Sequence, residues 1–200
     1  IAERLTAVAK GELKRLIINM PPRHTKSEFA SIYFPSWMMG LQPNLKIMQT
    51  THTADLSINF GRKVRNLMDT EEYTKIFQDV NLAADSKSAG KWQTSKGGEY
   101  FAAGVGGAIA GRGADLLIID DPHSEQDAMS MNLLDSCYEW YTSGPRQRLQ
   151  PGGAIVIVMT RWSTMDLTGR LLTRQTELNS DQWEVIELPA IFEDTEEVLW

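Results

Sequence analysis

Short, mostly apolar runs recur along the chain and predict buried β-strands. They occupy residues 16–18, 45–51, 116–119 and 154–159, and turn-forming or charged residues bound them. A half-exposed strand would alternate apolar and polar side chains, whereas these runs show little alternation. Such strands are typical of a parallel sheet that is covered on both faces.

Apolar residues at helical spacing predict helices between these strands. The helical segments are residues 2–11, 28–39, 54–68 and 132–141. Residues 79–113 are rich in glycine, serine and lysine, which suits short strands and turns. Strands and helices alternate, with no internal repeat and no long linker. We therefore expect one α/β domain with a central, mainly parallel sheet and helices on both faces.

The composition is that of an ordinary globular domain. The 200 residues are 42% hydrophobic and 23% charged, which is enough apolar material for one sizeable core. No apolar run approaches the roughly 20 residues of a membrane-spanning helix, and no secretory signal is visible. The chain starts at Ile1 and stops at Trp200 without an initiator methionine, so we expect a fragment of a longer protein.

The net charge and the cysteine content limit the classes of function that we expect for this chain. A net charge of −6 argues against strong autonomous binding of nucleic acid, because that binding depends on lysine and arginine neutralising phosphates. This charge is still compatible with a DNA motor that binds DNA weakly, or that binds it through another domain or a ring of subunits. The single cysteine, Cys137, excludes an internal disulfide and a cysteine-cluster zinc site. Cytoplasm is therefore the expected compartment.

A lysine–serine pair follows the first predicted strand and a loop with two prolines. A phosphate-binding loop needs backbone N–H groups around the β-phosphate, a lysine for the β- and γ-phosphate oxygens and a hydroxyl for Mg²⁺. Lys26 and Ser27 supply the last two at the start of a predicted helix. The standard pattern has glycine one and six residues before the lysine, where this chain has Thr25 and Met20. The alternative is a lysine and a serine on an exposed helix N-terminus.

Two aspartates follow the predicted strand at residues 116–119. Asp120 would end a buried strand, where a carboxylate can hold Mg²⁺ in a phosphoryl-transfer site, and Asp121 could orient the attacking water. The alternative is an ordinary Asp-Asp-Pro turn. The combination with Lys26 and Ser27 in one α/β domain favours a nucleotide site.

Two further segments carry candidate residues. Thr160 and Arg161 follow the strand at 154–159, at the sheet edge where open α/β sheets bind ligands. A threonine there can sense the γ-phosphate, and an arginine can respond to charge lost on hydrolysis; the alternative is a strand end with a surface arginine. The glycine-rich segment 104–113 contains Arg112 and predicts unusual backbone dihedrals or a close approach, with a flexible linker as the alternative.

The order of these motifs resembles that in the large terminase subunits of tailed phages. The resemblance covers nearly the whole chain. It implies an ATPase domain with the additional-strand P-loop fold, whose adenine-binding motif would precede residue 1 and whose RNase H-like nuclease would follow residue 200. The resembling segments are 21–27, 62–65, 103–107, 111–122, 140–142, 152–154, 159–162 and 188–191.

The resemblance implies roles for residues of the phosphate loop. Lys26 would contact the β- and γ-phosphates of ATP, and Ser27 would hold Mg²⁺ together with Asp120. Arg23 would lie near the γ-phosphate of its own subunit. Thr25 replaces the glycine that the family usually has before the lysine, which bears on nucleotide affinity rather than on the location of the site. The residues expected to bind the nucleotide are Pro22, Arg23, His24, Thr25, Lys26 and Ser27.

The remaining candidates concern catalysis. Asp121 matches the catalytic carboxylate of the family, and Glu125 is a weaker rival for that role. Thr160 and Arg161 match the motif that couples hydrolysis to movement. Arg112 is a candidate arginine finger for a neighbouring subunit, because it is a lone arginine in a glycine-rich loop of a family that works as a ring.

The implied function is Mg²⁺-dependent ATP hydrolysis that drives double-stranded DNA into a procapsid. The implied partners are double-stranded DNA, the portal protein and the small terminase subunit. The expected oligomeric state is a ring-shaped homo-oligomer on the capsid, and a monomer is possible in isolation. No membrane partner is implied. The implied location is the cytoplasm of the infected bacterial host. Two other functions stay open: another P-loop DNA-dependent ATPase such as a helicase, and a nucleotide-binding module with little turnover.

Overall fold

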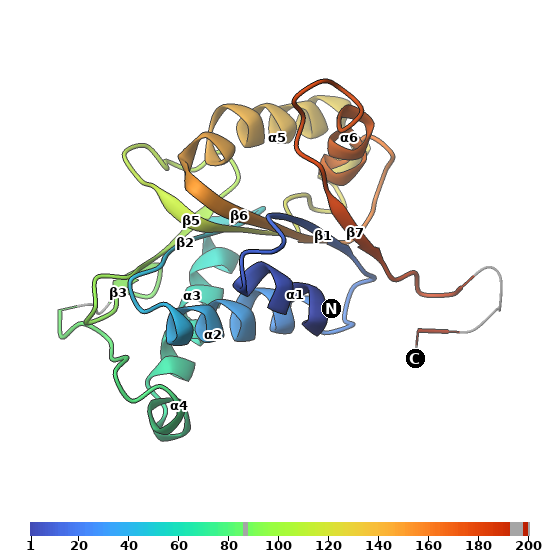
Figure 1. Cartoon of the computed structure of the whole chain (residues 1–200). Coiled ribbons are helices and arrows are strands. Elements are labelled where there is room, and N and C mark those ends of the chain that lie inside the picture. The colour runs from blue at the N-terminus through green and yellow to red at the C-terminus, as the bar shows by residue number, and fades with distance from the viewer. Residues whose placement is uncertain (86–87, 193–197, 200) are drawn as a thin grey trace.

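A mostly parallel sheet of seven strands lies at the centre of the molecule (Figure 1). The computed structural model describes residues 1–85, 88–192 and 198–199. Within this part of the chain the strand order is β3-β4-β2-β5-β6-β1-β7, and only the edge strand β3 runs antiparallel to its neighbour. The strands are β1 (Arg15–Asn19), β2 (Lys46–Thr51), β3 (Lys91–Gln93), β4 (Glu99–Gly104), β5 (Ala114–Asp120), β6 (Leu149–Met159) and β7 (Glu184–Glu187).

Helices cover both faces of the sheet, which confirms the predicted α/β architecture (Figure 1). One face carries α1 (Ala2–Ala9), α2 (Phe34–Leu41) and α3 (Ala54–Met68), and the other carries α5 (Met131–Ser143) and α6 (Leu167–Arg174). The shorter helical segments are η1 (Glu28–Tyr33, a π-helix), α4 (Glu71–Ile76), and the 3₁₀ turns η2 (Asp127–Met129) and η3 (Pro145–Arg148).

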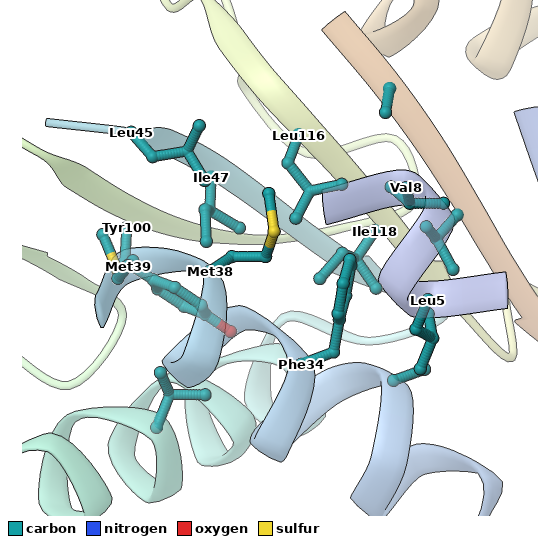
Figure 2. Close-up of a cluster of buried hydrophobic side chains, with 14 of the residues drawn as sticks. Leu5, Val8, Phe34, Met38, Met39, Leu45, Ile47, Tyr100, Leu116 and Ile118 are labelled. Carbon is teal, nitrogen blue, oxygen red and sulfur yellow. The ribbon is translucent and has the colours of Figure 1, made fainter. Parts of the chain in front are cut away.

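Each face of the sheet has its own apolar core, because successive strand residues point to opposite faces. In β5, Leu116 and Ile118 belong to the cluster that includes α1, α2 and α3, whereas Leu117 and Ile119 belong to the cluster that includes α5 and α6. Figure 2 shows Ile118 beside Phe34 of α2. Burial of each such side chain contributes about 1.5–3 kcal/mol, so β5 is held firmly from both faces.

The predicted strands and helices are present, with two kinds of difference. The segment 28–39 is helical, but it begins with the π-helical η1 before α2 continues to Leu41. The elements α4, α6 and β7 are not predicted by the sequence pattern, because each is short and its apolar positions are too few to define a period. As expected, residues 79–113 hold only short strands and turns. In the part of the chain described here, every helix is too short or too polar to cross a bilayer.

The parallel strands end together at one edge of the sheet, here called the carboxyl edge. Asn19 of β1 pairs with Met159 of β6, and Asp120 of β5 pairs with Thr51 of β2. The chain leaves β1 through α2 on one face and leaves β6 through α6 on the other face, in opposite directions along the sheet. Such a reversal leaves a crevice outside the strand ends, where open α/β sheets bind ligands. The crevice between β1 and β6 is therefore the expected site.

Candidate functional site

The loop at residues 20–27 joins β1 to η1 and has a strained backbone. Arg23 and Thr25 have φ values of 64° and 61°, in the left-handed region that costs a non-glycine residue roughly 1 kcal/mol or more. Thr25 thus has a glycine-like backbone at the position where the standard phosphate loop has glycine. Local contacts hold this shape: the His24 ring nitrogen Nδ1 lies 2.8 Å from the Pro22 carbonyl oxygen, and the Thr25 hydroxyl donates to the His24 carbonyl oxygen at 2.6 Å.

Lys26 is buried at the end of this loop, with 6% of its side chain exposed. Its Nζ lies 2.8 Å from Asp121 Oδ2 and donates a hydrogen bond to Thr160 Oγ1 at 3.1 Å. Lysine is almost never fully buried without partners, and here the partners come from the ends of β5 and β6. The alternative of a lysine on an exposed helix start is therefore wrong.

Asp120 is almost completely buried, at 1% exposure. The Ser27 hydroxyl donates to Asp120 Oδ1 at 3.0 Å, and the Ser31 hydroxyl donates to Oδ2 at 2.6 Å. Burial and the charge of Asp121 raise the pKa of Asp120 to about 7, although both serine hydroxyls and Lys26 act in the opposite direction. The surroundings therefore do not fully stabilise the ionised carboxylate, and a bound cation would stabilise it.

Asp121 makes hydrogen bonds at the ends of two neighbouring strands, β6 and β2. Its φ of 42° lies in the left-handed region, and its N–H donates to the Val158 carbonyl oxygen at 2.8 Å. Its Oδ1 accepts the Thr160 N–H at 2.7 Å, and its carbonyl oxygen accepts the His52 N–H at 3.2 Å. This strained turn aims the side chain of Asp121 at Lys26 rather than at the solvent.

Thr160 and Arg161 diverge after β6. Thr160 faces the loop, since its hydroxyl also lies 3.4 Å from the Met20 carbonyl oxygen. Arg161 turns away, with its Nε 2.9 Å from Asp166 Oδ2. Asp166 is fully buried and accepts the Gly169 N–H at 2.9 Å, so it caps α6. Arg161 is thus joined to the start of α6.

Two predicted residues lie away from this cluster. Glu125 is exposed in the turn that follows β5. Arg112 precedes β5 and lies near the opposite, amino edge of the sheet; the seven residues of β5 separate the edges by about 20 Å. There Arg112 Nη1 lies 2.9 Å from Glu99 Oε1, and its guanidinium carbon is 3.8 Å from the ring centre of Phe101.

The glycine-rich segment 104–113 has the predicted unusual backbone. Gly106 and Gly111 have φ values of 76° and 74°, which favour glycine. Gly104 is needed for close approach, because a Cβ there would lie 2.7 Å from the backbone nitrogen of Ala54 at the start of α3. Both halves of the prediction, unusual dihedrals and close approach, are confirmed.

Three residues of the site region have no role in the sequence-based prediction. Ser31 is the partner of Asp120 described above, and its position four residues after Ser27, on the same helix face, is the signal that could have revealed it. Asp166 stands directly before α6, which is a helix-cap signal. His123 is buried, and its Nε2 accepts the Leu167 N–H at 3.0 Å; burial lowers its pKa. No sequence signal identifies His123.

The oxygen atoms at the carboxyl edge fit Mg²⁺ better than a softer metal. Ser27 and Asp120 offer a hydroxyl and a carboxylate side by side. Within the described residues no group of three or more His, Cys, Asp or Glu side chains could enclose a metal ion. Mg²⁺ needs no such enclosure, because it is usually held by one or two carboxylates together with substrate phosphates.

The comparison with solved structures concerns the fold. The crystal structure of the HK97 bacteriophage large terminase is similar, with a TM-score of 0.57 at 11% sequence identity. The fold is terminase-like. The match covers 92% of this chain and 37% of that chain, so the chain spans little more than a third of the terminase it resembles. No protein-family model and no curated protein matches the sequence.

Proposed function

We propose that this chain hydrolyses ATP as the motor domain of a DNA-packaging terminase. The observation that carries the proposal is the buried Lys26, held between Asp121 and Thr160 at the crevice between β1 and β6. Ser27 lies one residue further on and contacts Asp120. A lysine, a hydroxyl and two carboxylates at this place match the needs of phosphoryl transfer, and the terminase-like fold supports the same reading.

In this proposal the loop at residues 20–27 binds the phosphates. Lys26 would leave Asp121 and contact the β- and γ-phosphates, which carry more negative charge than one carboxylate. Ser27 and Asp120 would hold Mg²⁺, and the bound ion would neutralise charge on the phosphate oxygens. Arg23, which is exposed in the loop, has the reach to approach the γ-phosphate from the solvent side.

Asp121 would activate the attacking water once Lys26 has moved to the phosphates. The water oxygen forms a bond to the γ-phosphorus, the bond from that phosphorus to the bridging oxygen breaks, and the water proton passes to Asp121. The Thr160 N–H would hold the Asp121 carboxylate in place during this step, as it does in the structure. Thr160 would respond to loss of the γ-phosphate, because it contacts Lys26.

The wider function includes partners outside this chain. We propose that the domain acts on double-stranded DNA, together with a portal protein and a small terminase subunit, in the cytoplasm of an infected bacterium. A ring of copies would supply the grip that a chain of net charge −6 lacks on its own.

The first test is hydrolysis of ATP with Mg²⁺ by Lys26→Ala. Loss of the lysine charge should reduce the rate at least a hundredfold, while Lys75→Ala, a change of an exposed lysine on α4, should leave it unchanged. Phosphate release measures the rate, and thermal melting checks that both variants are folded. An unchanged rate in Lys26→Ala would end the proposal. If wild-type protein also unwinds a forked DNA duplex when ATP is present, the chain is a helicase instead.

The second test separates binding from chemistry. Asp121→Asn should keep most of the ATP affinity and lose turnover, because the carboxylate acts on the water and not on the ground-state nucleotide. If turnover persists, the catalytic role moves to Glu125. If wild-type protein binds ATP without turnover above background, the chain is a nucleotide-binding module.

A further inference from the structure

A cavity of about 220 Å³ lies between α5 and α6, which pack on the same face of the sheet (Figure 1). The loop that joins α6 to β7 forms a third wall of this cavity. Leu171 and Arg174, in the second half of α6, line it. The candidate nucleotide site instead adjoins the start of α6, through Arg161 and Asp166. The cavity is therefore a separate place in the molecule.

Tyr141 of α5 brings an unpartnered hydroxyl to this cavity. Tyr141 lines the cavity and is 1% exposed, and its hydroxyl has no hydrogen-bond partner within the described part of the chain. A buried hydroxyl without a partner is unfavourable, and buried tyrosine hydroxyls usually have one. Burial and the nearby charge of Asp181 raise the pKa of Tyr141. The hydroxyl therefore keeps its proton and can donate it in a hydrogen bond to a bound group.

The charged side chains around the cavity leave an excess of positive charge. Arg146 Nε lies 2.8 Å from Asp181 Oδ2, and Arg15 Nε lies 3.0 Å from Asp181 Oδ1. Arg174 Nη1 lies 3.9 Å from Glu177 Oε1, and both of these side chains are more than half exposed, so their attraction is weak. Three arginines thus face two carboxylates. The excess of one positive charge matches a carboxylate better than a phosphate dianion.

The apolar part of the lining limits the rest of the ligand. Trp183, Leu171 and the ring of Tyr138 line the cavity. The guanidinium carbon of Arg174 already lies 5.2 Å from the ring centre of Tyr138, so a second cation at this ring would be repelled. The volume is below the roughly 300–1,000 Å³ of pockets that hold drug-sized molecules. The ligand that fits is therefore small, partly apolar and negatively charged.

We propose that this cavity binds a small monocarboxylic acid with an apolar group. The Tyr141 hydroxyl and the Arg146 guanidinium would donate hydrogen bonds to its carboxylate. Arg146 uses its Nε for Asp181, and an arginine has four further N–H donors on its two Nη atoms. The apolar group would pack against Trp183 and Leu171. The site lies outside the nucleotide crevice, so the inference does not depend on the proposed function.

Benzoate is the probe, and benzamide is its neutral counterpart of similar shape. Wild-type protein should bind benzoate with a Kd of about 1 mM or below, and benzamide at least about tenfold more weakly. Backbone amide shifts in an NMR titration should change at residues 138–147 and 171–183, and not at residues 20–27. Tyr141→Phe should weaken benzoate binding about threefold to tenfold, and Arg146→Gln about tenfold or more, because its hydrogen bond is charged.

Tyr73→Phe is the matched control. Tyr73 is also buried, but it packs on the other face of the sheet and its hydroxyl donates to the Ser36 carbonyl oxygen at 2.8 Å. Tyr73→Phe should lower the melting temperature and leave the benzoate affinity unchanged. Tyr141→Phe should not lower the melting temperature, because its hydroxyl has no hydrogen bond to lose within the described residues. Lys26→Ala should keep benzoate binding, because the phosphate loop is not this site.

Three results would overturn the inference. The first is equal affinity for benzoate and benzamide, or no saturation by benzoate up to about ten times the expected Kd. The second is a set of shift changes at the phosphate loop instead of the cavity. The third is unchanged benzoate affinity in both Tyr141→Phe and Arg146→Gln. None of these measurements involves ATP, so a failure of the proposed function leaves the inference standing.

Discussion

At the scale of residues, the candidate site holds several non-glycine residues in a conformation that favours glycine. Arg23 and Thr25 in the loop and Asp121 after β5 all have positive φ. Strain of this kind persists where the surrounding structure fixes it, and it is common at functional sites. The sequence could not predict these dihedrals, because Arg, Thr and Asp usually adopt negative φ. The juxtaposition of Lys26 and Asp121 was predictable, because both follow parallel strands that end at one edge.

We expect Thr25→Gly to relieve strain. Glycine adopts a φ near 61° without a steric cost, which should raise the free energy of unfolding by about 1 kcal/mol. The greater entropy of glycine in the unfolded chain offsets part of this gain. Nucleotide affinity should be kept or improved. Thr176→Gly, at an exposed turn residue without positive φ, should bring no gain. Denaturant unfolding measures both variants. Loss of nucleotide binding in Thr25→Gly would mean that the threonine side chain contacts the ligand.

Asp120→Asn should stabilise the metal-free protein while abolishing hydrolysis. The folded-state pKa of Asp120 is about 7, above its ordinary value of 3.8. Between about pH 4 and pH 7 the folded state therefore holds this proton more tightly, and stability falls as the pH rises. Asparagine has no such penalty, so the variant should gain about 2–4 kcal/mol at pH 8 and little at pH 4. Unfolding without Mg²⁺ at both pH values checks this. A gain that does not change with pH contradicts it.

At the scale of elements, sequence pattern and structure agree where apolar runs are continuous. The runs at 16–18, 116–119 and 154–159 lie in β1, β5 and β6, since only a doubly covered strand needs apolar residues at every position. The pattern fails for α6, whose stability depends on the capping residue Asp166 as well as on buried side chains. It also misses the π-helical character of η1, because π turns depend on tertiary packing and have no sequence period.

The π-helical segment η1 matters because it carries Ser31 to Asp120. We expect Ser31→Ala to raise the Mg²⁺ concentration needed for half-maximal hydrolysis about tenfold or more, since partners that orient a metal-binding carboxylate typically contribute that much. Ser36→Ala is the matched control, because Ser36 is also buried and its hydroxyl donates to the Ile32 carbonyl oxygen at 2.6 Å. Ser31→Thr should restore part of the affinity. Equal Mg²⁺ requirements in both alanine variants would show that Ser31 is only structural.

At the scale of the whole molecule, the two edges of the sheet have different roles in the proposal. The carboxyl edge would hold the nucleotide, whereas Arg112 lies near the amino edge with Glu99 and Phe101. The length of β5, about 20 Å, prevents Arg112 from reaching the phosphates of its own subunit. Any catalytic role of Arg112 must therefore be played on a neighbouring copy in a ring.

The last prediction is that Arg112 acts on such a neighbour. An arginine supplied by another subunit can accelerate phosphoryl transfer by about 10³–10⁵, so the specific activity of wild-type protein should rise with protein concentration. Arg112→Ala should lose that rise and keep its nucleotide affinity. Because Arg112 also pairs with Glu99, Glu99→Gln serves as the control: it breaks the ion pair, leaves the guanidinium available, and should keep the rise. Mixing Arg112→Ala with Lys26→Ala protein should restore part of the activity, since the Lys26→Ala subunit still offers its arginine to an intact neighbouring site. If the mixture stays inactive where wild-type subunits assemble and hydrolyse ATP, Arg112 has no such role, and Arg23 is the remaining candidate.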